Sequence, residues 1–182
     1  MIPYPTTLTN GTITLRPVQL DDVSTMTQAV HESIPAIMPW MGWCHPDFSE
    51  AEARIWISSL PAAWRAGTQY AFAITDTQDG TFLGGCGLNH INRIYRLANL
   101  GYWVRTSAAG RGIATQATRL LARFGIERLN LLRAEIVVAV DNHASLRVAE
   151  KCGAAREGVL RNRLIVRGNI LDAVMHALGP QD

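Results

Sequence analysis

The chain has 182 residues, of which 48% are hydrophobic and 18% are charged, with 15 glycines and 8 prolines. This is the length of one domain and the composition of a globular protein, which excludes disordered and collagen-like structure. The net charge is only +2, from 17 basic and 15 acidic residues, so a surface devoted to gripping nucleic acid or an anionic membrane is excluded as well.

Cysteine usage and the N-terminus indicate a cytoplasmic protein. Cys44, Cys86 and Cys152 are widely spaced and form no C-x-x-C pair, so neither a disulfide framework nor a zinc site is signalled. The N-terminus lacks a basic segment followed by an apolar one, and no apolar run is long enough to span a bilayer. We therefore expect a cytoplasmic protein with no metal, no membrane and no direct nucleic-acid partner.

The first third of the chain predicts a strand, a helix and a loop. Residues 12–16 alternate between apolar and polar side chains and are stopped by Pro17, which is typical of a strand. Apolar residues then recur at helical spacing over residues 23–30. Residues 34–46 contain three prolines and no steady period, which predicts an irregular, aromatic-rich loop.

The middle of the chain predicts a second helix and an antiparallel meander. Residues 49–52 form a capping box ahead of the helix, which Pro61 is expected to kink near its end. Residues 70–74 and 82–88 read as strands on either side of an Asp-Gly turn, which favours a hairpin. Alternation over residues 98–104 adds the next strand of the meander.

The second half of the chain continues with a glycine turn and an amphipathic helix. Residues 136–140 form an uninterrupted apolar run, typical of a central strand buried on both faces. A short helix over about residues 143–151 and strands near 158–166 and 170–178 follow. The order β-α-α-β-β-β-α-β-α-β-β predicts one α/β (α+β) domain over residues 1–182, with a mixed, mostly antiparallel sheet of about seven strands flanked by about four helices.

The strongest local signal is Ala109-Gly110-Arg111-Gly112-Ile113-Ala114-Thr115, at the start of the amphipathic helix. Two glycines let the backbone approach a ligand, and the first helical turn presents unpaired N–H groups, so the motif is a candidate phosphate site. A Walker loop needs a Gly-Lys pair that the chain lacks, and a dinucleotide fingerprint needs Gly or Ala where Thr115 stands. Taken alone, the motif is equally a plain strand-to-helix turn.

A second motif, Val140-Asp141-Asn142-His143-Ala144-Ser145, leaves the predicted buried strand and enters the short helix. Together with Leu15-Arg16-Pro17 and Asp21-Asp22, the two motifs resemble the GNAT superfamily of acyl-CoA N-acyltransferases. Within it, the Asp-Asn-x-Ala-Ser run and the loop at Trp40 are most similar to the ribosomal-protein N-terminal (alanine/serine) acetyltransferase branch. The likeness spans nearly the whole chain.

The resemblance implies direct transfer of an acetyl group from acetyl-CoA to a primary amine in a ternary complex. The backbone N–H groups of the glycine loop would hold the CoA pyrophosphate, although Ala109 stands where the family has Gln or Arg. These loop residues are Gly110, Arg111, Gly112, Ile113, Ala114 and Thr115. The strand that ends at Val104 would pair with the pantetheine arm, and the Val104 N–H would face the thioester carbonyl.

The resemblance also implies roles for two residues of the short helix. Asn142 would bond to the pantetheine arm, and Ser145 would protonate the departing thiolate. From position alone, Asn142 is equally a helix N-cap and Ser145 an ordinary first-turn serine. Because a serine is a weak acid, we expect Ser145 to relay or orient a proton.

The general base is not identified by a motif. Relatives in this branch place a glutamate on the strand after the short helix, but alignment through Glu157 puts Leu164 there. Glu157 is itself a candidate catalytic carboxylate, and its structural alternative is a surface ion pair with Arg156 or Arg161. Three further candidates stay open: His90, Asp172 and a bound water.

Two tryptophans and a basic stretch are candidates for the acceptor side. Trp40 and Trp43 lie where related enzymes shape the acceptor pocket, and they either clamp the substrate or pack the loop onto the core. The one dense basic stretch consists of Arg161, Arg163 and Arg167, with Arg156 nearby. Arg161 and Arg163 should share one strand face, which either attracts an acidic acceptor or RNA or is solvated.

The acceptor and two other classes of activity stay open at this stage. The amine is either a protein N-terminus or a small amine such as an amino acid, a polyamine or an aminoacylated antibiotic. The missing glutamate also allows a non-catalytic acyl-CoA sensor, and Cys44 or Cys86 allows an acyl-cysteine route, although no pattern marks either thiol as activated. The two terminal strands and the long helix around Trp56 are each a candidate surface for a homodimer.

Overall fold

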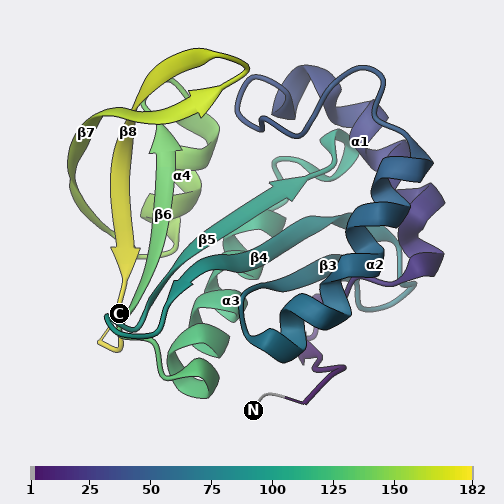
Figure 1. The fold of residues 1–182 in the computed structure, drawn as a ribbon, viewed down its shortest axis with the longest axis horizontal. Helices are drawn as coiled ribbons and strands as arrows, with labels where there is room; N and C mark the ends of the chain where they lie inside the picture. The colour runs from purple at the N-terminus through teal and green to yellow at the C-terminus, as the bar shows by residue number, and fades with distance from the viewer. Residues whose placement is uncertain (1–2, 182) are drawn as a thin grey trace.

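The protein is described by a computed structural model that covers residues 3–181. These residues form one eight-stranded sheet with four α-helices packed on it (Figure 1). The strands are β1 Leu8–Thr9, β2 Ile13–Pro17, β3 Tyr70–Asp76, β4 Phe82–Asn92, β5 Leu97–Val104, β6 Arg133–Ala139, β7 Ala155–Val166 and β8 Asn169–Leu178. The helices are α1 Val23–Ile37, α2 Glu50–Ala66, α3 Ile113–Leu129 and α4 His143–Lys151, with short 3-10 helices at Leu20–Asp22 and Thr106–Ala108.

The strand order is β1-β2-β3-β4-β5-β6-β8-β7, and β5–β6 is the one parallel pair in the described sheet. The mixed, mostly antiparallel fold is therefore confirmed. The sheet has one strand more than expected, because Leu8–Thr9 adds an edge to β2. The hairpin of β7 and β8 turns back so that β8, the last strand in sequence, lies between β6 and β7.

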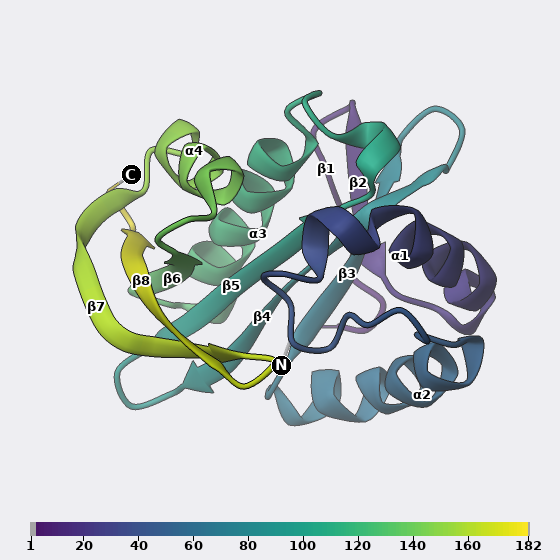
Figure 2. The ribbon, with the colours of Figure 1, turned by 90° about the horizontal axis from the view of Figure 1, so that it is seen from above.

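Helices cover both faces of the sheet, with α1 and α2 on one side and α3 and α4 on the other (Figure 2). Side chains that alternate along each strand divide the core in two. On β3, for example, Phe72 belongs to the cluster that includes Leu121 and Phe124 of α3. Its neighbour Ala73 belongs to the cluster that includes Val30 of α1.

The central feature of the sheet is the separation of β5 from β6. The two strands pair over only Leu97–Asn99 and Arg133–Glu135. Beyond these residues they diverge, as Figure 1 shows above the shared lower end. The backbone of β5 beyond Asn99 therefore has no neighbouring strand on the side that faces β6.

Three local expectations were wrong. Residues 34–46 are not wholly irregular, because α1 runs through Pro35 to Ile37. A proline in the last turn costs one helical hydrogen bond and leaves the earlier turns intact. The strand at 136–140 is not buried on both faces, since Val137 is partly exposed where β5 has moved away.

The third wrong expectation concerns the basic stretch of β7. Leu160 pairs with Ala173 and Leu164 with Leu171, so three residues of β7 lie opposite one residue of β8. Asn162, in the middle, has a left-handed φ of 53°. Because this bulge interrupts the alternation of a regular strand, the two-residue spacing of Arg161 and Arg163 no longer places their side chains on one regular strand face.

Candidate active site

The end of β5 places a free backbone donor at the strand separation. Arg105 donates its backbone N–H to Leu83 O over 2.9 Å, and Gly84 lies opposite Val104 in the β4–β5 ladder. Because bonded and non-bonded pairs alternate in an antiparallel ladder, the Val104 N–H turns away from β4. It therefore faces the side from which β6 has diverged, and its role as an oxyanion donor stays a prediction.

Helix α1 holds this strand end in place. Thr106 donates its N–H to Ser33 Oγ over 3.0 Å, and Ser107 donates to Glu32 Oε1 over 2.6 Å. The other oxygen of Glu32 accepts Arg105 Nε–H over 3.0 Å. The hydrogen bond from Arg105, with that from Ser107, lowers the pKa of Glu32 to about 2, so this carboxylate stays charged and keeps these bonds at neutral pH.

The glycine loop ends in an uncapped helix start. Gly110 and Gly112 both have φ of 76°, a left-handed conformation that favours glycine. Gly112 is the N-cap of α3 and makes no side-chain cap bond, while Gln116 N–H, which donates to Gly112 O over 3.0 Å, begins the helical ladder. Ile113 is buried and anchors the helix start. The N–H groups of residues 113–115 are thus available to an anion at the positive end of the helix dipole.

The short helix α4 begins at His143, as expected, and Asn142 is its N-cap residue. The side-chain Oδ1 of Asn142 accepts the Ser145 N–H over 3.1 Å, which confirms the N-cap reading of Asn142 and uses one side-chain atom. The bond that the resemblance implies, from Asn142 to the pantetheine arm, stays a prediction.

A tyrosine that sequence reasoning missed completes this part of the site. Tyr102 Oη lies 2.9 Å from Ser145 Oγ and donates to Ser145 O over 3.2 Å. Burial raises the pKa of Tyr102 to about 12. The spacing of Tyr102 and Val104 could have indicated this role, because residues two apart in a strand share a face. From the sequence, Tyr102 was expected only to be an apolar strand residue. The Tyr102–Ser145 pair therefore links β5 to α4 across the separation.

The two candidate tryptophans take different positions. Trp40 lines a cavity of about 300 Å³ together with residues at the ends of β6 and β8. The lining residues are Trp40, Ala139, Val140, Asp141, Ile170, Leu171 and Asp172. Trp43 instead packs its ring against Trp103 at 5.9 Å and Phe48 at 5.8 Å, so it packs the loop onto these rings while it stays 40% exposed.

The loop that carries Trp40 is joined to the β7–β8 hairpin. Arg167 Nη1 donates to Cys44 O over 3.4 Å. Figure 1 shows the tip of this yellow-green hairpin beside the dark blue loop after α1. The cavity is therefore walled by two segments that are far apart in sequence.

Glu157 does not join this site. It forms a two-pronged ion pair with Arg133, so the expected pairing with Arg156 or Arg161 was wrong. The hydrogen bonds from Arg133, together with its charge, lower the pKa of Glu157, which makes its carboxylate a weaker base. The ladder also places Glu157 near Ile136, in the first half of β6, whereas Ser145 follows the far end of that strand.

Of the other candidate positions for the base, Leu164, His90 and Asp172, only Asp172 lies at the cavity beside Trp40. Leu164 lies opposite Leu171 in the β7–β8 ladder, so the expected glutamate position holds an apolar side chain. His90 is exposed at the far end of β4, next to the pair Asn89 and Asn99, where β5 still lies beside β6. His90 is therefore remote from Val104, while Asp172 lines the cavity.

The cysteines do not support an acyl-cysteine route. Cys44, Cys86 and Cys152 are all buried. Burial raises the pKa of each thiol, that of Cys152 to about 11. Because the thiolate is the nucleophile, thiols that stay protonated at neutral pH react poorly.

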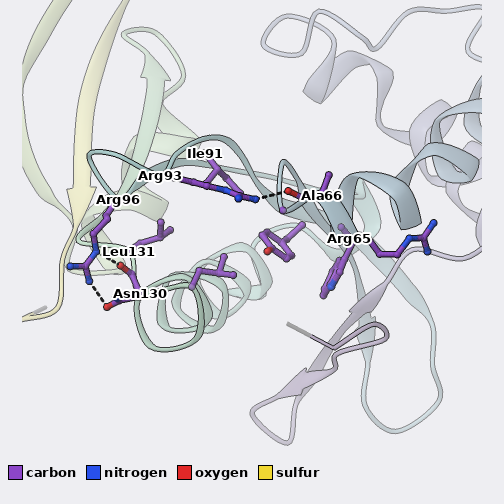
Figure 3. A pocket seen from close by; sticks show the side chains of 11 residues that line it. Arg65, Ala66, Ile91, Arg93, Arg96, Asn130 and Leu131 are labelled. Atoms are coloured by element: carbon purple, nitrogen blue, oxygen red, sulfur yellow. Dashed lines mark hydrogen bonds between the residues drawn. The ribbon is translucent and has the colours of Figure 1, made fainter. Parts of the chain in front are cut away.

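A larger cavity of about 540 Å³ lies at the opposite end of α3 (Figure 3). Two arginines at its rim cap helix ends: Arg93 donates to Ala66 O over 2.5 Å, and Arg96 Nε donates to Asn130 O over 2.7 Å. A helix of 17 residues is about 26 Å long, which separates this cavity from the glycine loop. Cavity size therefore does not mark the catalytic site here.

The site combines three features: two parallel strands that separate, a helix start in the glycine loop with no side-chain cap, and the Tyr102–Ser145 hydroxyl pair. This combination is typical of a transferase that uses an acyl-CoA. Residues 12–155 match the family model described as an acetyltransferase (GNAT) domain, and the chain belongs to this family. It is an acetyl-CoA-dependent N-acetyltransferase, which transfers an acetyl group to an amine.

Relatives match over most of the chain. The putative ribosomal N-acetyltransferase YdaF of Bacillus subtilis is 28% identical over 93% of this chain and 92% of its own length. The structure of a putative ribosomal-protein-serine acetyltransferase from Vibrio cholerae superposes with a TM-score of 0.86 at 28% identity, over 99% of this chain and 100% of that one. Mycobacterium smegmatis RimJ, in complex with CoA-disulfide, gives a TM-score of 0.88 at 26% identity, over 98% and 89%.

Residues 3–181 contain neither a metal-binding cluster nor a membrane-spanning helix. No cluster of three or more His, Cys, Asp or Glu side chains is arranged to hold a metal ion there. None of the helices in that range combines the length and apolar character needed to cross a bilayer.

Proposed function

We propose that this enzyme acetylates the N-terminal α-amine of a protein, of the ribosomal-protein type, in the cytoplasm, with residues 1–182 acting as one domain. The likeness to YdaF and to the Vibrio cholerae protein, both named for ribosomal acetylation and both matched over nearly the whole chain, carries this proposal. The site supports the proposal because it offers two separate binding regions: the glycine loop for the acetyl donor, and the cavity at Trp40 for the acceptor.

The donor side is assigned to the glycine loop and the end of β5. When bound, acetyl-CoA supplies the acetyl group as an activated thioester. The N–H groups of residues 113–115 hold the pyrophosphate, because they are unpaired and lie at the positive end of α3. The Val104 N–H stabilises the oxyanion of the tetrahedral intermediate. In enzymes of known mechanism, one such donor is worth about 3 kcal/mol of transition-state stabilisation.

The Tyr102–Ser145 pair is assigned to the departing thiolate. Ser145 Oγ–H donates a proton toward the sulfur, and the 2.9 Å contact with Tyr102 Oη holds the Ser145 hydroxyl in place. With a pKa of about 12, Tyr102 keeps its proton at neutral pH and stays a hydrogen-bonding partner of Ser145. A serine that is weakly acidic alone thereby gains a partner.

The ionisation of the acceptor favours an α-amine. An α-amino group has a reference pKa of roughly 7.7–8.0, whereas that of lysine is about 10.4. A much larger fraction of the α-amine is therefore neutral at physiological pH. Because the usual glutamate position is Leu164, an acceptor that needs less help from a base fits this site better.

An acceptor competition tests the proposal. The purified enzyme and acetyl-CoA are incubated with hexapeptides that begin with serine or alanine and contain one lysine, with the same peptides blocked at the N-terminus, and with spermidine. Fragmentation mass spectrometry then locates the acetyl group. We expect it on the free N-terminus. Transfer to spermidine or to the lysine side chain in preference to the N-terminus contradicts the α-amine assignment, and CoA binding without transfer to any acceptor favours the sensor alternative.

A further inference from the structure

We propose that Asp172 receives the ammonium group of the acceptor and removes its proton, and so takes the place of the missing glutamate. This inference rests on the proposed function, because it assigns a catalytic base to the same transfer. Asp172 stands on β8 and lines the cavity of about 300 Å³ beside Trp40.

The lining of this cavity suits a cation. Asp141 and Asp172 are its two carboxylates, and none of its seven lining residues is basic. Trp40 supplies an indole wall, and the face of a tryptophan ring attracts an ammonium group. Two negative groups and an aromatic wall are the features that select an amine over a neutral or anionic compound.

The bulge in β7 holds the Asp172 carboxylate. Three residues of β7 lie opposite Asp172 alone, and the middle one, Asn162, donates its backbone N–H to Asp172 Oδ1 over 2.8 Å. Within residues 3–181 this is the one side-chain hydrogen bond of Asp172 that the structure shows. One oxygen is thus fixed by the backbone, and Oδ2 is left for a ligand.

A backbone hydrogen bond joins Asp172 to the residue that follows the end of β6. Val140 donates its N–H to Asp172 O over 3.1 Å. From Val140 the chain passes through Asp141 to Asn142, the cap of the helix that carries Ser145. The carboxylate is therefore next to the strand end that leads to the proposed proton donor. Leu164, at the family position, lies opposite Leu171, the immediate neighbour of Asp172.

The proton and electron balance of the step is complete with these groups. The acceptor binds as an ammonium ion, and Asp172 Oδ2 takes one proton, which leaves the amine with its lone pair. The nitrogen attacks the thioester carbon, an N–C bond forms and the C–S bond breaks. The electron pair leaves with sulfur, which takes a proton from Ser145. As the amide forms, the nitrogen loses its second proton to Ser145, so the products are the amide, the CoA thiol and protonated Asp172. Of the charged groups near Asp172, Asp141 lines the same cavity, and Arg161 and Arg163 flank Asn162 in the bulge opposite Asp172.

The pH dependence of an Asp172→Asn variant tests the inference, with Asp21→Asn as the matched control at an exposed carboxylate on the 3-10 helix before α1. The acceptors are a hexapeptide with a free N-terminal serine, and spermidine. General base catalysis contributes about 10²- to 10⁴-fold, so we expect Asp172→Asn to lower kcat/KM for the peptide at least about 30-fold near pH 6.5. Near pH 9.5, where the α-amine is already neutral, the deficit should shrink to about threefold. Asp21→Asn should follow wild type throughout.

The outcomes separate this inference from the proposed function. A deficit of Asp172→Asn that is equal at both pH values indicates a structural role and overturns the inference, as does a variant with wild-type activity. If wild type acetylates spermidine and not the peptide, the α-amine proposal fails. In that case a pH-dependent deficit with spermidine still supports Asp172 as the proton acceptor. If wild type acetylates neither, titration calorimetry with 2-phenylethylammonium decides: weaker binding to Asp172→Asn than to Asp21→Asn supports a cation site, and equal binding refutes it.

Discussion

Replacing Gly112 by alanine tests the role of the glycine loop most directly. Gly112 has φ of 76°, and a Cβ added there meets only Gln116 Nε2, at 3.9 Å. The new methyl group therefore causes no clash inside the protein and acts through two other effects. The left-handed backbone costs about 1–2 kcal/mol for a residue with a Cβ, which lowers the Tm of a chain of this length by about 2–8 °C.

The second effect falls on CoA, because the methyl group projects at the helix start that is assigned to the pyrophosphate. A hydrogen bond to a charged group contributes about 1.5–3 kcal/mol. Loss of one such bond weakens CoA binding by about 10- to 100-fold. Isothermal titration with CoA measures this change, and a thermal melt without ligand measures the strain.

Gly168→Ala is the matched control for this experiment. Gly168 has φ of 80°, and no atom lies within 4 Å of its added Cβ, so the backbone strain is similar. It lies in the turn between β7 and β8, away from the glycine loop. We expect a similar loss of Tm and a CoA affinity within about twofold of wild type. Equal CoA affinities for the two variants would refute the assignment of the loop to the pyrophosphate.

Three further predictions concern single side chains. Tyr102→Phe should lower kcat about 10-fold or more at an unchanged Kd for CoA. Combining it with Ser145→Ala should lower kcat little further, because the two hydroxyls act as a unit. Steady-state kinetics measure kcat, and CoA titrations measure Kd. Burial, and then the charge of Arg156, lowers the pKa of His176 from 6.5. In acid the unfolded chain therefore binds more protons than the folded one, so the free energy of unfolding should fall as the pH drops below about 6.5. Urea melts between about pH 5 and pH 8 should show this fall for wild type and not for His176→Leu. Leu164→Glu should leave kcat/KM within about twofold at neutral pH, because the cavity already holds a carboxylate base; a large gain would indicate that the family position is the one that matters.

The local elements and the cofactor loop could be predicted from the sequence because their causes lie within a few residues of chain. Alternation marked the strands that became β3, β4 and β5, and the spacing of α4 placed its first and last residues where the structure has them. The two loop glycines have the positive φ that such a turn requires. Asn142 caps α4 through a bond to the residue three positions on. Each of these features depends on backbone geometry and short-range hydrogen bonds.

The partners of the chemical side chains were decided only by the tertiary structure. Tyr102 meets Ser145 because β5 and α4 come together across a strand separation, and no local pattern encodes that meeting. Glu157 pairs with Arg133 because the ladders of β6, β8 and β7 bring them close. Asp172 lines the cavity because β8, the last strand in sequence, lies beside β6. Local periodicity determines the elements, whereas strand order and packing determine which side chains share a site.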